Sequence, residues 1–317
     1  MVSREKGNFL SSDKRTKIVY YVWQDDEVET KRGILQMAHG MTEHIGRYDE
    51  FATYMAEQGF IVVGNDHLGH GASVVSKREW GYFSEIEEHP MFLLVQDMHT
   101  LRGIIEEKYK SDNLPYFMLG HSMGSYVLRA YLCMHSDGLA GAILVGTGKE
   151  EDSAMKLGMG ICKALAKMLG WHHRGKLIKR LSAGPAYKGY NMDGSDIVNS
   201  WLSHNVEDIK NYFADERCTF TFTLNGYYAL MDVVLYDNQK ENIAKTNKDV
   251  PLFIISGEKD PVGNLGVGVK EVYDMYEDAG MKDITWKLYK DDRHEILHEP
   301  DRDVVFKDIL SWINVRL

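Results

Sequence analysis

The chain has 317 residues, of which 44% are hydrophobic and 26% are charged, proportions that are ordinary for a globular protein. This length suits a single α/β domain that carries an insertion. The formal net charge of −10 argues against a nucleic-acid partner.

The beginning of the chain predicts a cytoplasmic protein. Residues 1–15 are charged and lack the apolar stretch of a signal peptide. The most apolar window, residues 227–236, contains Asp232 and is far shorter than the roughly 20 residues that a membrane span needs. Cys133, Cys162 and Cys218 are expected to be reduced thiols. Export without a signal peptide stays open.

The elements that follow predict a mostly parallel sheet. Apolar runs at 18–23 and 34–38, separated by a polar stretch, indicate an antiparallel hairpin. Beyond them, short β-rich runs alternate with helical periodicities. The predicted strands cover 60–63, 115–119, 142–145, 252–255 and 284–289, and the predicted helices cover 47–58, 90–110, 123–135, 267–279 and 301–313. This alternation indicates a sheet with helices on both faces.

Residues 149–236 interrupt the alternation, because they contain no run typical of a buried strand. We interpret them as a helical cap between two parts of a core, residues 1–148 and 237–317. The cap begins with a helical pattern that places Lys156, Lys163 and Lys167 on one side, with mostly apolar residues elsewhere. Two interpretations remain open: a helix that meets a lipid surface and a cap helix packed onto the core.

The segment Gly120-His121-Ser122-Met123-Gly124 matches the pattern G-x-S-x-G between a predicted strand and a predicted helix. In this setting a serine forms a nucleophile elbow, whose strained backbone requires small neighbours. The alternative is a plain Gly-Ser turn.

A serine nucleophile needs a base and an orienting acid, which follow it in the order acid, then histidine. Asp260 ends a buried strand, and His294 follows the strand 284–289. Both lie beyond carboxyl ends of strands, where ligand and catalytic groups gather in such sheets. Glu258 and His298 are the nearest rivals, although His298 is expected on the helix that follows.

Acyl transfer also requires amide donors for the oxyanion. One is expected to be the N–H of Met123, directly after the serine. The loop after 34–38 contains His39-Gly40, which lets the backbone turn and makes the N–H of Met41 the second donor.

The sequence gives no support for a metal or a nucleotide cofactor. Five histidines gather in the first half, but none has a recognised zinc spacing, and no nucleotide-binding glycine pattern follows a first strand. We therefore predict no cofactor and no catalytic metal. The histidines are His39, His44, His67, His70 and His121.

Together these motifs resemble the α/β-hydrolase superfamily, and within it the monoacylglycerol lipase/lysophospholipase group that is classed with serine aminopeptidase-like hydrolases. The cap segment 200–223 is also similar to bacterial members. The resemblance implies an α/β-hydrolase fold with a helical cap after the sixth strand, Ser122 as nucleophile, Asp260 as acid and His294 as base. The matching core stretches are HGMTEHIGRYDEFATYMAEQGFIVVGNDHLGHGAS at 39–73, LGHSMGS at 119–125, SGEKDPVGN at 256–264 and RHEILHE at 293–299.

Two departures from the group put the exact substrate in doubt. Thr42 stands where the group usually has glycine and is expected to narrow the acyl site. Asp291 and Asp292 stand where the group usually has small residues.

The resulting hypothesis is hydrolysis of a carboxylic ester with a hydrophobic acyl chain, such as a monoacylglycerol or a lysophospholipid, with transient lipid contact through the cap. A peptidase or amidase on the same scaffold is the first alternative, and it would need acidic residues in the cap to hold the substrate amine. A non-catalytic binding protein is the second. The acidic residues available are Asp152, Glu207, Asp208 and Asp215.

Overall fold

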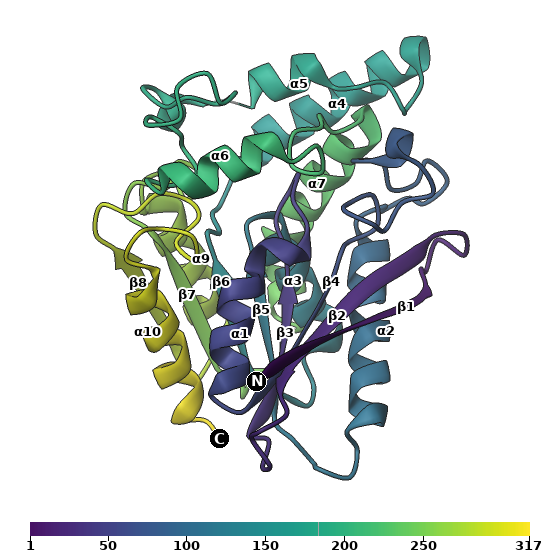
Figure 1. The fold of residues 1–317 in the computed structure, drawn as a ribbon. Helices are drawn as coiled ribbons and strands as arrows, with labels where there is room; N and C mark the ends of the chain where they lie inside the picture. The colour runs from purple at the N-terminus through teal and green to yellow at the C-terminus, as the bar shows by residue number, and fades with distance from the viewer. Residues whose placement is uncertain (183) are drawn as a thin grey trace.

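The computed structural model describes residues 1–182 and 184–317, which form an eight-stranded sheet in the order β1-β2-β4-β3-β5-β6-β7-β8 (Figure 1). β1 is antiparallel to β2 and β2 to β4, whereas all other neighbours are parallel. The strands are β1 (Val2–Leu10), β2 (Lys17–Asp25), β3 (Gly33–Ala38), β4 (Phe60–Asn65), β5 (Tyr116–His121), β6 (Leu139–Val145), β7 (Leu252–Gly257) and β8 (Ile284–Tyr289).

The predicted hairpin between 18–23 and 34–38 is wrong. β2 forms its hairpin with β1, where Phe9 lies opposite Ile18. β3 lies instead between β4 and β5 and is parallel to both. β1 is an edge strand with an exposed, charged centre, so it lacks the apolar alternation that marks a half-buried strand.

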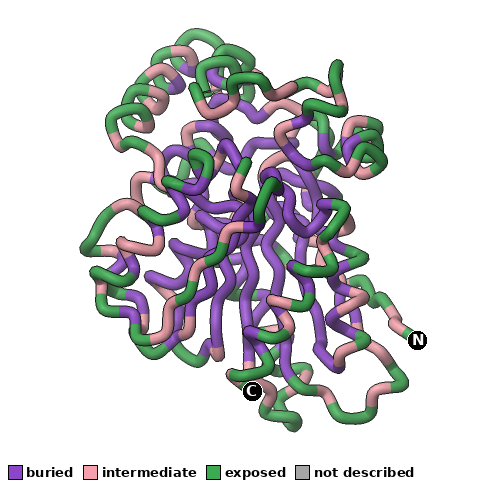
Figure 2. Tube along the Cα trace, turned by 90° about the vertical axis from the view of Figure 1, so that its left-hand side faces the viewer, coloured by how far each residue is buried: buried purple, intermediate pink, exposed green. Residues whose placement is uncertain are grey.

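Helices cover both faces of the sheet, as predicted, and alternate strand residues divide the interior into two cores. In β7, Ile254 packs into the core beneath α2, α3 and α9, while Ile255 packs into the core beneath α1 and α10. Figure 2 shows the central strands buried along their length. The helices are α1 (Asp49–Glu57), α2 (Phe92–Lys108), α3 (Met123–His135), α4 (Asp152–Leu169), α5 (Lys176–Leu181), α6 (Val206–Ala214), α7 (Leu224–Asp237), α8 (Lys240–Ile243), α9 (Val267–Asp278) and α10 (Arg302–Asn314).

The helical cap follows β6 and lies over the carboxyl ends of the strands, with α4, α5 and α6 outermost (Figure 1). α4 packs against α7 through a face that buries Cys162 and Ala166. Lys163 and Lys167, each next to one of these buried residues, are exposed, and the Lys163 ammonium lies 5.1 Å from the ring centre of Tyr228 on α7. The boundaries at 148 and 236 stay predictions, and the second falls one residue before the end of α7.

The cysteines and the apolar segments agree with what the sequence predicts of them. The three cysteines are buried free thiols. Within the described residues, no helix has both the length and the apolar character that crossing a bilayer requires.

Candidate active site

Ser122 occupies a sharp turn between β5 and α3. Its backbone has φ 52° and ψ −121°, which is strained for a residue with a side chain. The turn is held by a hydrogen bond from the Ser122 N–H to the carbonyl of Val145 at 2.9 Å. This geometry places Ser122 between the carboxyl end of β5 and the first turn of α3.

The two flanking glycines are required by close backbone contacts. A Cβ atom at Gly120 would overlap the carbonyl oxygen of Gly124. One at Gly124 would overlap the carbonyl oxygen of Ala38, at the end of β3. Because backbone cannot move aside as a flexible side chain does, no larger residue fits either position.

Asp260 lies in the loop after β7 and is fully buried. Its carboxylate accepts hydrogen bonds from the Ser256 hydroxyl at 2.7 Å and from the Val262 N–H at 2.8 Å. Burial by itself would raise the pKa of Asp260, but the charge and hydrogen bond of His294 outweigh burial and lower it. The carboxylate is therefore ionised at neutral pH.

His294 lies in the loop after β8 and is 1% exposed. Its Nδ1 is 3.0 Å from each carboxylate oxygen of Asp260. Burial alone would lower the pKa of His294, but the charge of Asp260 and the hydrogen bond to it raise the pKa. An ionised acceptor keeps the proton on Nδ1 and leaves Nε2 free to act as a base. No hydrogen bond joins Nε2 to Ser122 among the residues that the structure describes, although such bonds are often long in the absence of substrate.

The rival residues lie elsewhere. The side chain of Glu258 is 44% exposed and lies 3.8 Å from Lys259. His298 bonds through Nε2 to the carbonyl of Arg47 at 3.0 Å. The expectation that His298 lies on a helix is wrong, because α10 begins only at Arg302 and residues 296–301 form turns.

The loop after β3 approaches the Ser122 turn closely. A Cβ atom at Gly40 would lie 3.1 Å from the Cβ of Ser122. Met41 follows Gly40 in this loop, and Met123 follows Ser122 directly and begins α3. The two residues predicted to donate amides thus belong to segments that adjoin Ser122.

Thr42 has a φ of +53°, a region in which glycine is favoured. Its hydroxyl lies 3.0 Å from that of Tyr212 on α6, and the Tyr212 hydroxyl also donates to the Thr42 carbonyl at 3.2 Å. The Thr42 side chain therefore forms a contact between the core loop and the cap. The predicted narrowing of the acyl site stays a prediction.

Glu43 is the main site residue that the sequence reasoning missed. It is 2% exposed and accepts hydrogen bonds from the Gly40 N–H and, at 2.8 Å, from the Tyr48 hydroxyl. Burial opposes its ionisation, but the hydrogen bond from His121 and the charge of Arg47 hold the pKa of Glu43 well below its usual range. A carboxylate thus holds the backbone of the loop that carries Met41. The sequence feature that points to Glu43 is its place shortly after a buried strand and the His39-Gly40 turn.

Arg47 connects Glu43 to the histidine loop and to the cap. One guanidinium nitrogen donates to Glu43 at 2.8 Å and to Glu295 at 2.6 Å. The other donates to Glu295 at 2.7 Å and to Asp208 of α6 at 2.8 Å. Charge pairs of this kind hold their partners in place because removing one member leaves a buried charge uncompensated. One side chain therefore links the loop of Glu43, the loop of His294 and the cap.

The cap also contacts the His294 loop directly. Trp201 stacks on the imidazole of His294, with ring centroids 4.9 Å apart and an interplanar angle of 26°. The N–H of Glu295 donates to the carbonyl of Leu202 at 2.7 Å. Arg293 donates to three carbonyls of the cap, those of Val198, Ser200 and Ser203. These contacts cover the imidazole face and fasten both neighbours of His294.

The two aspartates before Arg293 differ in their surroundings. Asp291 is exposed, with a φ of +64°. Asp292 is 5% exposed, and burial together with the charges of Asp301 and Glu299 raises its pKa to about 7. The buried carboxyl therefore gains a proton at a much higher pH than an ordinary aspartate.

Comparison with known proteins agrees with this architecture. The family model described as "Serine aminopeptidase, S33" matches residues 29–301. A monoacylglycerol lipase of Mycolicibacterium smegmatis is 27% identical over 300 residues, covering 94% of this chain and 92% of that protein. Two solved structures, both at 98% coverage of this chain, extend the likeness to three dimensions.

The first structure is a highly thermostable carboxyl esterase of Bacillus coagulans in complex with glycerol, with a TM-score of 0.85, 30% identity and 98% coverage of that chain. The second is a soluble variant of a monoglyceride lipase of Saccharomyces cerevisiae in complex with a substrate analogue, with a TM-score of 0.76, 20% identity and 94% coverage of that chain. These likenesses confirm the fold that the sequence predicts, including the cap after β6.

Proposed function

Because the chain belongs to the serine aminopeptidase S33 family and has the α/β-hydrolase fold, we propose that it is a serine hydrolase that cleaves carboxylic esters with a hydrophobic acyl chain. The observation that carries this proposal is the strained Ser122 turn, which lies at the same end of the sheet as the buried His294–Asp260 pair. Strain of this kind persists only where surrounding structure holds it, and it is typical of functional sites.

In the proposed reaction, Nε2 of His294 removes the hydroxyl proton of Ser122 as the serine oxygen attacks the ester carbonyl. Asp260 holds the ring and stabilises the imidazolium that forms. Collapse of the tetrahedral intermediate transfers that proton to the departing alcohol and leaves an acyl-enzyme. Water, activated by the same imidazole, then releases the carboxylic acid and restores the serine.

The N–H groups of Met41 and Met123 are proposed to bind the oxyanion. Support comes from the close approach of Gly40, next to Met41, to Ser122, from the place of Met123 directly after Ser122, and from the anchoring of the first loop by Glu43. Preorganised donors of this kind stabilise the transition state, because they need no reorganisation when negative charge develops on the oxygen.

The proposed substrate is a monoacylglycerol or a related lysolipid. Support comes from the named activities of the relatives and from the apolar side chains that the cap exposes among its lysines. On α4, Leu157 is 67% and Met168 is 82% exposed, beside Lys156 and Lys167. We propose that this face makes transient contact with the lipid aggregate that supplies the substrate.

An amidase or peptidase is less well supported, because most of the cap acids are already paired. Asp208 binds Arg47, Asp215 binds Arg217, and Asp152 accepts from Asn238. Glu207, exposed at the start of α6, and Glu150 form no ion pair with any residue that the structure describes, so both remain candidates for holding an amine. Glu150 is the more buried of the two. Burial raises its pKa, which favours the uncharged form.

The test replaces the serine. Ser122→Ala should lower the turnover of a p-nitrophenyl ester by about 10⁴-fold or more with an unchanged melting curve. Ser153→Ala, on the exposed side of α4, is the matched control and should keep wild-type turnover. Wild-type turnover in Ser122→Ala would refute the nucleophile assignment.

Two further measurements address the alternatives. A fluorophosphonate probe should label Ser122, and failure of both labelling and turnover would favour a non-catalytic binding protein. Esters of graded acyl length compared with an aminoacyl amide should favour a medium or long ester. Faster turnover of the amide, lost in Glu150→Gln, would favour the peptidase.

A further inference from the structure

A polar seam joins the loop after β3 to the end of α6, away from the Ser122 turn. It borders an open pocket of about 200 Å³ whose lining includes His44, Asp215 and Cys218. The seam comprises three contacts, from Thr42 to Tyr212, from Arg47 to Asp208 and from His44 to Asp215. The first two contacts hold the cap against the core. The third brings together side chains that can bind a metal ion and that line the pocket.

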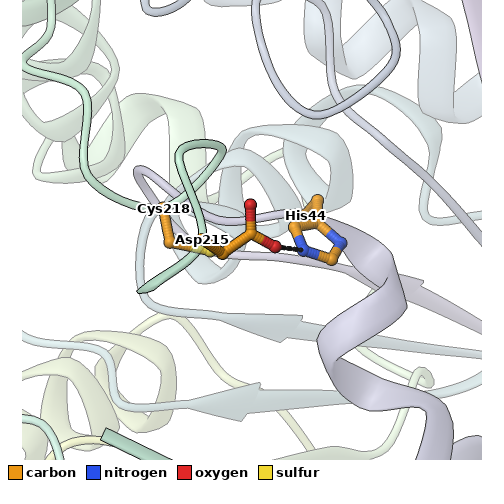
Figure 3. A group of neighbouring side chains, drawn as sticks. All are labelled: His44, Asp215 and Cys218. Atoms are coloured by element: carbon orange, nitrogen blue, oxygen red, sulfur yellow. Dashed lines mark hydrogen bonds and ion pairs between the residues drawn. The ribbon is translucent and has the colours of Figure 1, made fainter. Parts of the chain in front are cut away.

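Three different donor atoms converge at this point. A ring nitrogen of His44, a carboxylate oxygen of Asp215 and the Sγ of Cys218 all lie within 4.8 Å of one another. His44 and Asp215 face each other, and Cys218 stands beside Asp215 on the same cap loop (Figure 3). A hydrogen bond from the Cys218 N–H to the Asp215 carbonyl at 2.9 Å closes the turn that brings their side chains together.

We propose that His44, Asp215 and Cys218 form a binding site for a transition-metal ion of the zinc class. Thiolate and imidazole ligands suit zinc, whereas magnesium and calcium prefer sites made of oxygen atoms only. Three protein ligands with an open fourth position are a common zinc arrangement, and the pocket leaves room for a water there.

The protonation of the ligands is compatible with this assignment. Burial and the charge of Arg217 lower the pKa of His44, so its imidazole is neutral and has a lone pair to donate. The Cys218 thiol is 2% exposed and makes no hydrogen bond within the described part of the chain. Burial raises its pKa, so the thiol loses its proton to solvent only when a cation binds.

Small movements would complete the coordination. Ligands around a tetrahedral zinc ion lie about 3.5 Å apart, with bonds of about 2.0–2.3 Å. The Nε2 of His44 is already 3.1 Å from the Asp215 carboxylate, so Cys218 is the group that must move inward. Arg217 shares that carboxylate, but its side chain is 47% exposed and can turn into solvent.

A second group of possible ligands, Asp208, Glu295 and His298, does not qualify. The guanidinium of Arg47 already binds Glu295 through two nitrogens and Asp208 through one of them. A metal ion there would displace or repel an existing buried cation. The comparison favours the His44 group, whose thiol has no competing partner.

A metal at this site would fasten the cap loop to the loop that carries Met41, because His44 lies only three residues beyond Met41. The site is separate from the proposed chemistry, so its occupancy is measurable in protein that has lost all turnover.

Cobalt(II) is the probe, since a thiolate ligand gives it a charge-transfer band in the near ultraviolet. The full-length protein, freed of metal and kept reduced, should bind one equivalent of Co²⁺ with this band, and Zn²⁺ should abolish the band by displacement. Zn²⁺ should also raise Tm, because it binds only the folded site. Absence of the band in the wild-type protein at millimolar Co²⁺ would overturn the proposal.

Variants identify the ligands. Cys218→Ser should lose the band, and His44→Gln should bind Co²⁺ at least about tenfold more weakly. Cys162→Ser is the matched control, because Cys162 is also a buried free thiol but lies on α4, and it should keep the band. Loss of the band in Cys162→Ser with retention in Cys218→Ser would overturn the assignment. If Cys218→Ser fails to fold, the His44→Gln titration decides, and wild-type affinity there would refute it.

Discussion

Replacing Glu43 by glutamine tests whether the carboxylate positions the loop that carries Met41. Glutamine preserves the shape of the side chain and a carbonyl oxygen that can accept from the Gly40 N–H. It removes the charge that faces Arg47 at 2.8 Å and His121 at 3.3 Å. The perturbation therefore loosens the loop without opening a cavity.

The magnitude follows from the bonds involved. Hydrogen bonds to a charged group contribute about 1.5–3 kcal/mol each, and loss of a whole oxyanion donor costs about 2.7–4 kcal/mol of transition-state stabilisation. Glu43→Gln keeps the donor but misplaces it, so we expect a loss of about 1–3 kcal/mol, which is roughly 5–150-fold in kcat. KM should change little, because the interaction is made only in the transition state. Arg47 keeps Glu295 and Asp208 as partners, so the protein should remain folded.

The assay measures kcat and KM separately on a p-nitrophenyl ester and records a thermal melt of each variant. Glu258→Gln is the matched control, since that side chain is 44% exposed and lies outside the network. A Glu43→Gln variant with a lowered Tm and an unchanged kcat would refute the positioning role and leave Glu43 with a structural one.

Three further predictions concern packing and protonation. Gly124→Ala should destabilise the fold by about 1–3 kcal/mol in urea unfolding, because its Cβ would overlap the backbone at the end of β3, whereas Gly160→Ala, with open space, should not. The plot of kcat/KM against pH should rise through an apparent pKa above 6.5, since the carboxylate beside His294 favours its charged form and only the neutral form is a base; a midpoint below 6.5 would contradict this. Asp292→Asn should raise Tm at pH 8 but not at pH 4, and Asp291→Asn should do neither. The folded pKa of Asp292, about 7, exceeds its ordinary value of 3.8, so ionisation of Asp292 lowers the free energy of unfolding progressively as the pH rises between these values.

Several features of the site could be predicted because they follow directly from buried strands. Ser122, Asp260 and His294 each come shortly after an apolar run, and parallel strands bring their carboxyl ends to one edge. The glycine at 124 was predicted from the turn, and its close contact with β3 explains it in space. A short apolar strand can be recognised from its own residues, so the position of a residue that follows it can be predicted without knowing any distant contact.

Other features leave no such signal. β1 is an exposed edge strand with charged residues. It pairs with β2 through main-chain hydrogen bonds, which its side-chain pattern does not reveal. The role of Glu43 depends on Arg47, and that of Arg47 on Glu295, which lies 248 residues away along the chain. A surface acid and a buried, paired acid look alike in a single sequence, and only the fold distinguishes them.

The bonds that Arg293 and Glu295 make to the cap carbonyls have a consequence for regulation. Residues 198–203 are hydrogen-bonded to both neighbours of His294, the proposed base. A movement of these cap residues is therefore expected to change the orientation of the imidazole. We expect a molecule that shifts the cap on binding to change the alignment of His294. By reciprocity, an acyl group held at Ser122 would then change the affinity of the cap for that molecule. Displacement of the cap would then lower turnover. Binding of a molecule that holds the cap against the core would favour the conformation in which His294 is aligned.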